Sequence, residues 1–272
     1  MARRVLVTGA DKGIGLATVV HLARLGFEVT GSVRSDDRAA DLAKAVAEAG
    51  VDVAPVVLEL DDAEAAERLV SELRPWGLVN NAGYMNVGAL VDVPPEDAAR
   101  QLEAMVVAPV RLAQLALPAM RQRGEGRIVN VSSITAHVTG AMVGWYQATK
   151  HALSAATDAL RREVASWGIE VVLIEPGGID TGIWDKAEEE LVRRGTGSPY
   201  SVPYERSLRI LHRLRPTMRG PEPVAETIGT ALTAGRPRAH YVVGTDARVL
   251  QVLDLVVPSP LKDRAIRAVL GL

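Results

Sequence analysis

Short apolar stretches alternate along the chain with amphipathic segments, and glycine or proline residues mark most of the boundaries. The apolar stretches have the length of strands and cover residues 5–7, 28–33, 53–58, 78–79, 127–131, 169–174 and 240–243. Apolar residues at helical spacing predict helices between them, at 16–25, 37–49, 62–73, 95–121 and 221–234, with a further one that contains residues 146 and 150. This alternation predicts an α/β fold, a Rossmann-type doubly wound parallel sheet with right-handed crossovers.

Two segments depart from the regular pattern. Residues 182–220 mix charges with scattered apolar and aromatic side chains, and we expect them to form a mobile lid over a site. Residues 248–272 have the pattern of an amphipathic helical tail with basic residues, for which an interfacial membrane helix is the alternative. Asp254 and Pro258 interrupt its apolar face, so packing against the protein is favoured. Together these segments and the sheet make one predicted domain, residues 1–272.

Composition narrows the class of protein. With 272 residues and 48% hydrophobic content, the chain can bury one large core. Its net charge of −2 and the lack of basic runs argue against nucleic-acid partners. It has no cysteine, no cluster with metal-ligand spacing, no signal-peptide pattern and no apolar run long enough to span a bilayer. We therefore expect a cytoplasmic protein without a metal ion.

The segment TGADKGIG, residues 8–15, joins the first predicted strand to the first predicted helix. Its glycines would let the backbone approach a pyrophosphate, and the start of a helix favours negative charge. The spacing differs from G-x-G-x-x-G, and an ordinary strand-to-helix turn is the alternative interpretation. The position of the segment nevertheless favours a dinucleotide site.

The choice between the two nicotinamide cofactors should be decided at the end of the second strand. An acidic residue there binds the ribose 2′-hydroxyl, whereas an arginine accepts a 2′-phosphate. Here Val33 is followed by Arg34, and Lys12 lies in the glycine turn. Two converging cations favour NADP(H) over NAD(H), although two solvated surface charges remain the alternative.

Tyr146 and Lys150 are four residues apart in a predicted helix, so their side chains share one face. Ser133 precedes them at the end of a predicted strand. Tyrosine ordinarily titrates near pH 10, and a cation about 5 Å away would lower its pKa by roughly two units. We expect Tyr146 to act as general acid and base, with Ser133 bonded to the same substrate oxygen. Each residue taken singly also has a purely structural interpretation. Ser133 could be a strand-end cap, Tyr146 a half-buried aromatic residue and Lys150 a solvated charge on a helix.

The motifs, in this order, resemble those of the short-chain dehydrogenase/reductase family over nearly the whole chain. TGADKGIG resembles the family's TGxxxGxG turn, NNAG at 80–83 its motif after the fourth strand, and Tyr146 with Lys150 its YxxxK. Ser133, thirteen residues before Tyr146, matches the family's catalytic serine. HYVVGTDA at 240–247 is similar to members that act on hydroxysteroids and retinoids.

The resemblance implies the residues that hold a cofactor and a substrate. The implied cofactor residues are Gly9, Asp11, Lys12, Gly13, Ile14, Gly15, Arg34, Glu59, Leu60, Asn81, Ala82, Gly83, Tyr146, Lys150, Pro176, Gly177, Ile179 and Thr181. An apolar substrate would meet Ser133 and the apolar candidates Met85, Val143 and Trp184. His137 is a further candidate for substrate contact, with a solvated bystander as its alternative. Members of the family commonly form dimers or tetramers, so a homo-oligomer is expected.

Two positions depart from the family pattern. Met105 stands where the family usually has an asparagine that holds a water for proton relay to the lysine, and a thioether cannot replace those bonds. Glu59 stands where an aspartate usually contacts the adenine amine. The predicted function is an NADP(H)-dependent ketone–alcohol oxidoreductase. Met105 leaves open a non-redox enzyme that uses Tyr146 for isomerisation, elimination or cyclisation. A nucleotide-sensing protein without turnover is a third possibility.

Overall fold

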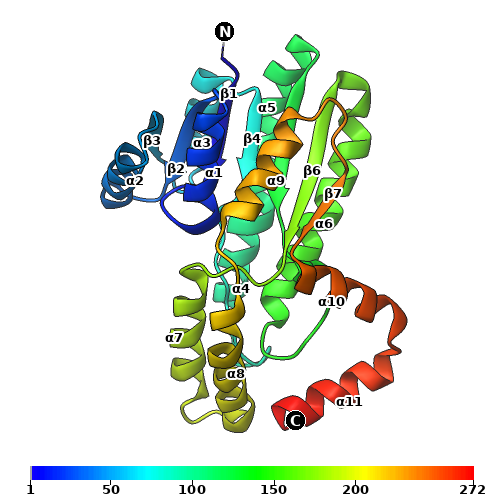
Figure 1. Cartoon of the computed structure of the whole chain (residues 1–272). Coiled ribbons are helices and arrows are strands. Elements are labelled where there is room, and N and C mark those ends of the chain that lie inside the picture. Colours follow the sequence, from blue (N-terminus) through cyan, green and yellow to red (C-terminus); the bar gives the residue numbers. More distant parts are fainter. Residues whose placement is uncertain (1) are drawn as a thin grey trace.

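The computed structural model describes residues 2–272, and within them seven parallel strands form one sheet of order β3-β2-β1-β4-β5-β6-β7 (Figure 1). The strands are β1 (Arg4–Thr8), β2 (Glu28–Val33), β3 (Val53–Val57), β4 (Gly77–Asn80), β5 (Gly126–Val131), β6 (Ile169–Pro176) and β7 (His240–Val243). The order reverses between β1 and β4, where the chain crosses from one half of the sheet to the other. In open α/β sheets this switch point is where ligands bind, at the carboxyl ends of the strands. The predicted fold is confirmed.

Helices cover both faces of the sheet. They are α1 (Gly13–Arg24), α2 (Asp36–Glu48), α3 (Ala63–Leu73), α4 (Pro95–Leu102), α5 (Ala108–Arg123), α6 (Gly144–Val164), α7 (Ile183–Gly195), α8 (Ser201–Leu214), α9 (Glu222–Thr233), α10 (Thr245–Val256) and α11 (Ser259–Leu270). The first core contains buried residues of α1, α2 and α9, and the second contains those of α3, α5 and α6. Along β1, Val5 and Val7 belong to the first core and Leu6 to the second, as the period of a strand requires.

The predicted helix at 95–121 is interrupted. A π-helical turn, Glu103–Val107, separates α4 from α5, and Pro109 follows directly in the first turn of α5. Proline has no N–H to donate, so its position near a helix start costs little. Among the described residues, the stretch Pro95–Arg123 has the length and apolar composition of a membrane span. Leu112, Ala116 and Met120 of α5 nevertheless pack in the second core.

The lid segment is more regular than its sequence pattern predicts. Residues 182–220 form α7, α8 and the short 3₁₀ turn Arg215–Thr217, which lie below the carboxyl ends of the strands (Figure 1). Their buried apolar residues belong to a third cluster, separate from the two sheet cores and including Leu191, Tyr204 and Leu211. These residues pack against parts of the cluster that are distant in sequence. Such packing stabilises helices that the local sequence pattern did not reveal.

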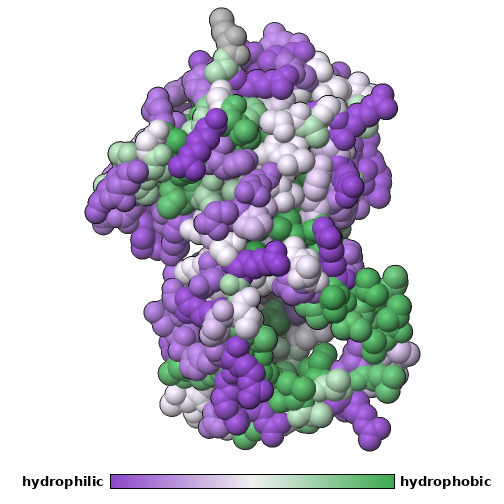
Figure 2. Space-filling model, viewed as in Figure 1, coloured by the Kyte–Doolittle hydropathy of each residue, from purple (hydrophilic) through white to green (hydrophobic). Residues whose placement is uncertain are grey.

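The tail consists of two helices, α10 and α11, which meet at an angle around Pro258 (Figure 1). Apolar side chains of these helices are exposed beside a hollow that opens toward α8 (Figure 2). They include Leu250, Leu253, Leu255, Val256 and Leu261. Leu270, at the end of α11, is buried in the third cluster, so the tail is anchored to the lid side of the molecule.

Candidate active site

The glycine turn is held in a shape that only glycine can adopt. Gly9 and Gly13 have φ of 65° and 54°, and a Cβ on Gly9 would lie 2.8 Å from the Cα of Ala82. A Cβ on Gly15 would lie 1.9 Å from the carbonyl oxygen of Gly9. Without side chains at these positions, the backbone of the turn is open to the groove. No side chain caps the first N–H groups of α1, so these groups are free to bind an anion.

The NNAG segment clamps this turn. The Asn81 side chain donates to the carbonyl oxygens of Thr8 and Gly9, at 2.9 and 3.1 Å. In return, the Thr8 hydroxyl oxygen accepts hydrogen bonds from the backbone N–H groups of Asn81 and Ala82, at 3.0 and 3.1 Å. Asn81 thus shapes the turn with its side chain.

A groove of about 750 Å³ runs along the carboxyl ends of the strands. Most of the implied cofactor residues line it: Gly9, Asp11, Lys12, Gly13, Ile14, Gly15, Arg34, Glu59, Leu60, Asn81, Ala82, Gly83 and Thr181. Five of the implied cofactor residues are not part of its lining, namely Tyr146, Lys150, Pro176, Gly177 and Ile179. Sequence reasoning missed lining residues from other elements, namely Arg100 on α4, Glu103 in the π-helical turn, and Lys186, Glu190 and Arg193 on α7.

Ser133, Tyr146 and Lys150 come together in the structure. Ser133 caps a 3₁₀ turn, where its Oγ accepts a hydrogen bond from the Thr135 N–H at 3.2 Å. Its hydroxyl is close enough to Tyr146 to act on the phenol, whose pKa it lowers. Tyr146 and Lys150 are both buried, one turn apart on α6, and the Lys150 Nζ donates to the Val131 carbonyl at 2.9 Å. Two hydroxyls and an amine are thus gathered in a buried site.

Burial reverses the pKa shift that the sequence predicted for Tyr146. Removal from water raises the pKa of Tyr146 to about 12, and only the hydrogen bond from Ser133 opposes this. The same desolvation lowers the pKa of Lys150 to about 7. The expected lowering by Lys150 is therefore wrong for the protein by itself, because burial disfavours both charged forms.

Met105 lies in the π-helical turn and is buried against the NNAG segment. Its Sδ accepts a hydrogen bond from the Tyr84 N–H at 3.5 Å, and a Cβ on Gly83 would lie 3.0 Å from its Cε. The thioether thus fills the space beside this backbone, where the family's water-holding amide was expected.

The predicted substrate residues gather around Tyr146. Met85, Val143 and Trp184 belong with Tyr146 to the third apolar cluster, and the Trp184 indole donates to the Ile179 carbonyl at 2.7 Å. His137 does not join them, because its Nε2 lies 2.6 Å from a carboxylate oxygen of buried Glu175. The side chains that cluster with Tyr146 are therefore largely apolar.

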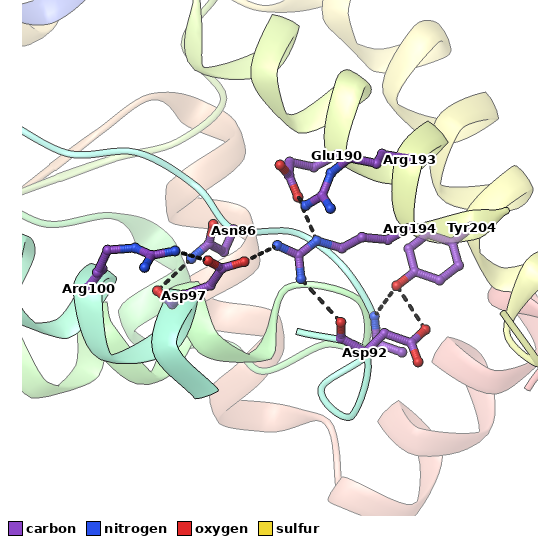
Figure 3. A network of polar contacts seen from close by, with 9 residues as sticks. Asn86, Asp92, Asp97, Arg100, Glu190, Arg193, Arg194 and Tyr204 are labelled. Atoms are coloured by element: carbon purple, nitrogen blue, oxygen red, sulfur yellow. Dashed lines mark hydrogen bonds and ion pairs between the residues drawn. The ribbon is translucent and has the colours of Figure 1, made fainter. Parts of the chain in front are cut away.

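A polar network ties the lid to the rest of the site (Figure 3). Arg194 of α7, only 4% exposed, pairs with Asp97 of α4 at 2.8 Å and with Glu190 at 2.6 Å, and donates to the Asp92 carbonyl. The Tyr204 hydroxyl of α8 donates to the Asp92 carboxylate at 3.0 Å. The sequence expectation of a mobile lid did not include these contacts, because Asp92 and Asp97 lie more than ninety positions before the lid residues that they bind.

Comparison with known proteins agrees with this geometry. A family model described as short chain dehydrogenase matches residues 3–191. The NADPH-dependent 3-dehydrocapnine reductase of Ornithobacterium rhinotracheale is 31% identical, over 96% of this chain and 95% of that protein. Estradiol 17-beta-dehydrogenase 2 of Rattus norvegicus is 33% identical, over 89% of this chain and 68% of that protein. A short-chain dehydrogenase from Sphingobium yanoikuyae in complex with NADPH has a TM-score of 0.73 and 26% identity, over 96% of this chain and 95% of that chain.

Proposed function

Because the chain belongs to the short-chain dehydrogenase family, as the order of its motifs predicted, we propose that it interconverts a ketone and a secondary alcohol on an apolar small molecule with NADP(H). The observation that carries this proposal is that Tyr146 and Lys150 are buried one turn apart on α6, with Ser133 close enough to act on the phenol and with Tyr146 in the third apolar cluster. Relatives that use NADPH or act on a steroid support the cofactor and the substrate class.

The groove fits a dinucleotide. A pyrophosphate needs close backbone and free N–H donors, and the Gly9 and Gly13 turn at the start of α1 offers both. Glu59 and Leu60 would border the adenine, and Arg34 with Lys12 would hold the 2′-phosphate. Ile179 and Thr181 would hold the nicotinamide, which when bound supplies or accepts a hydride.

Reduction needs a proton as well as a hydride. As the hydride reaches the carbonyl carbon, the electron pair of the C=O π bond moves to oxygen, and that oxygen takes the proton of the Tyr146 hydroxyl. Ser133 would donate to the same oxygen and keep it in place. With a pKa near 7, Lys150 can be protonated at neutral pH and stabilise the phenolate as it forms, before returning a proton to it. In oxidation the same steps run backwards.

The apolar wall sets the substrate class. Met85, Val143 and Trp184 offer the substrate no charge, and the exposed apolar residues of the tail border the hollow nearby (Figure 2). An apolar ketone would bury its body against this wall and direct its oxygen to Tyr146.

Met105 favours one alternative, a non-redox enzyme that uses the Tyr146 proton for isomerisation, elimination or cyclisation. Its thioether already accepts from the Tyr84 N–H and offers no strong hydrogen bond to a relay water. In the redox reaction, proton return to Lys150 would then have to follow another path.

Two measurements test the proposal. Titration calorimetry should show tighter binding of NADPH than of NADH, and NADPH absorbance should fall in step with consumption of ketone when steroid and other apolar ketones are screened. Turnover without any change in NADPH absorbance would favour the non-redox alternative. Failure to bind either nucleotide would refute the cofactor assignment.

A further inference from the structure

Three cations from three separate elements line one end of the groove: Lys12 in the glycine turn, Arg34 after β2 and Lys186 on α7. We propose that Lys186 is a third arm of the 2′-phosphate site, contributed by the lid, so that this phosphate holds α7 in its closed position. The inference rests on the proposed use of NADP(H). Arg34 and Lys12 lie outside the lid, so only Lys186 would make the lid sensitive to the difference between NADP(H) and NAD(H).

The direction of α7 brings Lys186 to this place. A Cβ on Gly182, just before the helix, would lie 3.5 Å from the Lys12 Nζ. Lys186 follows four residues later and therefore shares the face that approaches Lys12. Ala187 and Leu191 are buried in the third cluster, which fixes the rotation of the helix about its axis.

The cations act on one another. The pKa of Lys186 is lowered, first by burial and then by the positive charges of Arg34, Lys12 and Arg38. The carboxylate that opposes this shift is Glu189, on the same helix. The positive charges of Arg34, Lys12 and Arg38 therefore act on Lys186 across the groove.

Within residues 2–272, none of Lys12, Arg34 and Lys186 forms an ion pair. Two carboxylates of the groove are already paired with other arginines. Asp11 pairs with Arg38 at 3.8 Å, and Glu190 pairs with Arg193 and Arg194. Glu59 and Asp61 also line the groove, but neither pairs with Lys12, Arg34 or Lys186. Three cations without an ion-pair partner in one groove fit an anion of charge near −2, which is the charge of a phosphate monoester.

The same helix carries the wall of the substrate site. Trp184 bonds the Ile179 carbonyl, and Leu191 packs in the third cluster beside Tyr146. At its far end, Arg194 latches the helix to Asp97. A phosphate bound by Lys186 would secure the near end, so that NADP(H) would order the substrate wall more firmly than NAD(H).

The test uses fragments that differ in the 2′-phosphate, namely 2′,5′-ADP and 5′-AMP, and measures their affinity by calorimetry. Lys186→Gln should weaken 2′,5′-ADP binding about five- to tenfold, the size of one partly solvated charged hydrogen bond, and change 5′-AMP binding less than twofold. Lys186→Arg should restore most of the loss. The matched control is Lys44→Gln on α2, an exposed lysine 4.0 Å from Glu48, which should change neither affinity.

Equal losses for both fragments, or no loss for 2′,5′-ADP, would overturn the role of Lys186. Failure of the wild-type protein to bind NADPH at all would instead refute the proposed function, so the two failures are distinguishable. A second readout is cleavage by chymotrypsin at Tyr200, in the connection between α7 and α8. In the wild-type protein 2′,5′-ADP should slow this cleavage more than 5′-AMP does, and Lys186→Gln should abolish the difference; equal protection by both fragments would show that the lid does not sense the phosphate.

Discussion

The side-chain nitrogen of Lys150 lies 5.7 Å from the ring centre of Tyr146, and both side chains are buried. Burial raises the pKa of the phenol to about 12 and lowers the pKa of the amine to about 7. The pair is therefore stable in its uncharged forms just above neutral pH. A substrate oxygen that gains negative charge would find a proton on Tyr146, and Lys150 in its protonated form would stabilise the phenolate that remains.

The first prediction concerns stability. The folded pKa of Lys150, about 7, lies below the ordinary value of 10.5, so the unfolded chain binds the extra proton between these pH values and stability rises with pH there. Relative to Lys150→Met, the wild-type protein should therefore gain on the order of 3–5 kcal/mol between pH 6.5 and 10.5. Urea unfolding at several pH values measures this. Lys44→Met, at an exposed site, should give a flat difference, and a flat difference for Lys150→Met would contradict its depressed pKa.

Removal of the Tyr146 hydroxyl should stop proton transfer. Tyr146→Phe should lower kcat by about 10²- to 10⁴-fold, because the remaining groups cannot protonate the substrate oxygen as efficiently. The unfolding midpoint should change little. Tyr241→Phe, which removes a hydroxyl bonded to the Arg238 N–H at the sheet edge, should keep full activity. Retained turnover in Tyr146→Phe would exclude it as the acid.

Arg34 should distinguish the two nicotinamide cofactors. Arg34→Ala should weaken NADPH binding about tenfold, since one charged contact to the phosphate is lost, and leave NADH binding nearly unchanged. Calorimetry with each cofactor measures both affinities. If both fell equally, Arg34 would serve the turn itself and not the 2′-phosphate.

Met105 tests the proton path. Met105→Asn should leave kcat of the redox reaction unchanged or raise it, since an amide can hold a relay water and its oxygen can still accept from the Tyr84 N–H. Met105→Leu removes the sulfur at similar volume and serves as the control. A large fall in kcat for the asparagine variant, with normal folding, would show that the apolar residue has a role of its own.

Arg194 and Arg193 provide a matched pair, because both bond Glu190 but one is 4% exposed and the other 62%. Arg194→Met should destabilise the protein by about 2–4 kcal/mol, since it leaves Asp97 without its buried partner. Arg193→Met should cost less than about 0.5 kcal/mol. Chemical unfolding measures both changes. Similar small costs would show that the latch contributes little to holding the lid.

The sequence by itself determined the parallel sheet, the order of its motifs and the residues of the glycine turn. These features depend on local patterns, such as strand-length apolar stretches or the four-residue step from Tyr146 to Lys150, which a linear reading contains. It also located Met105 as the departure from the family pattern.

Only the tertiary structure decided how the residues act on one another. The pKa values of Tyr146 and Lys150 depend on burial, which sums contributions from elements distant in sequence. The Arg194 latch and the position of Lys186 depend on how α7 packs, and residues 182–220 gave no clear helical pattern because their apolar faces are completed by other segments. The free energy of these contacts depends on residues that are distant in sequence, so the spacing of residues along the chain does not reveal them.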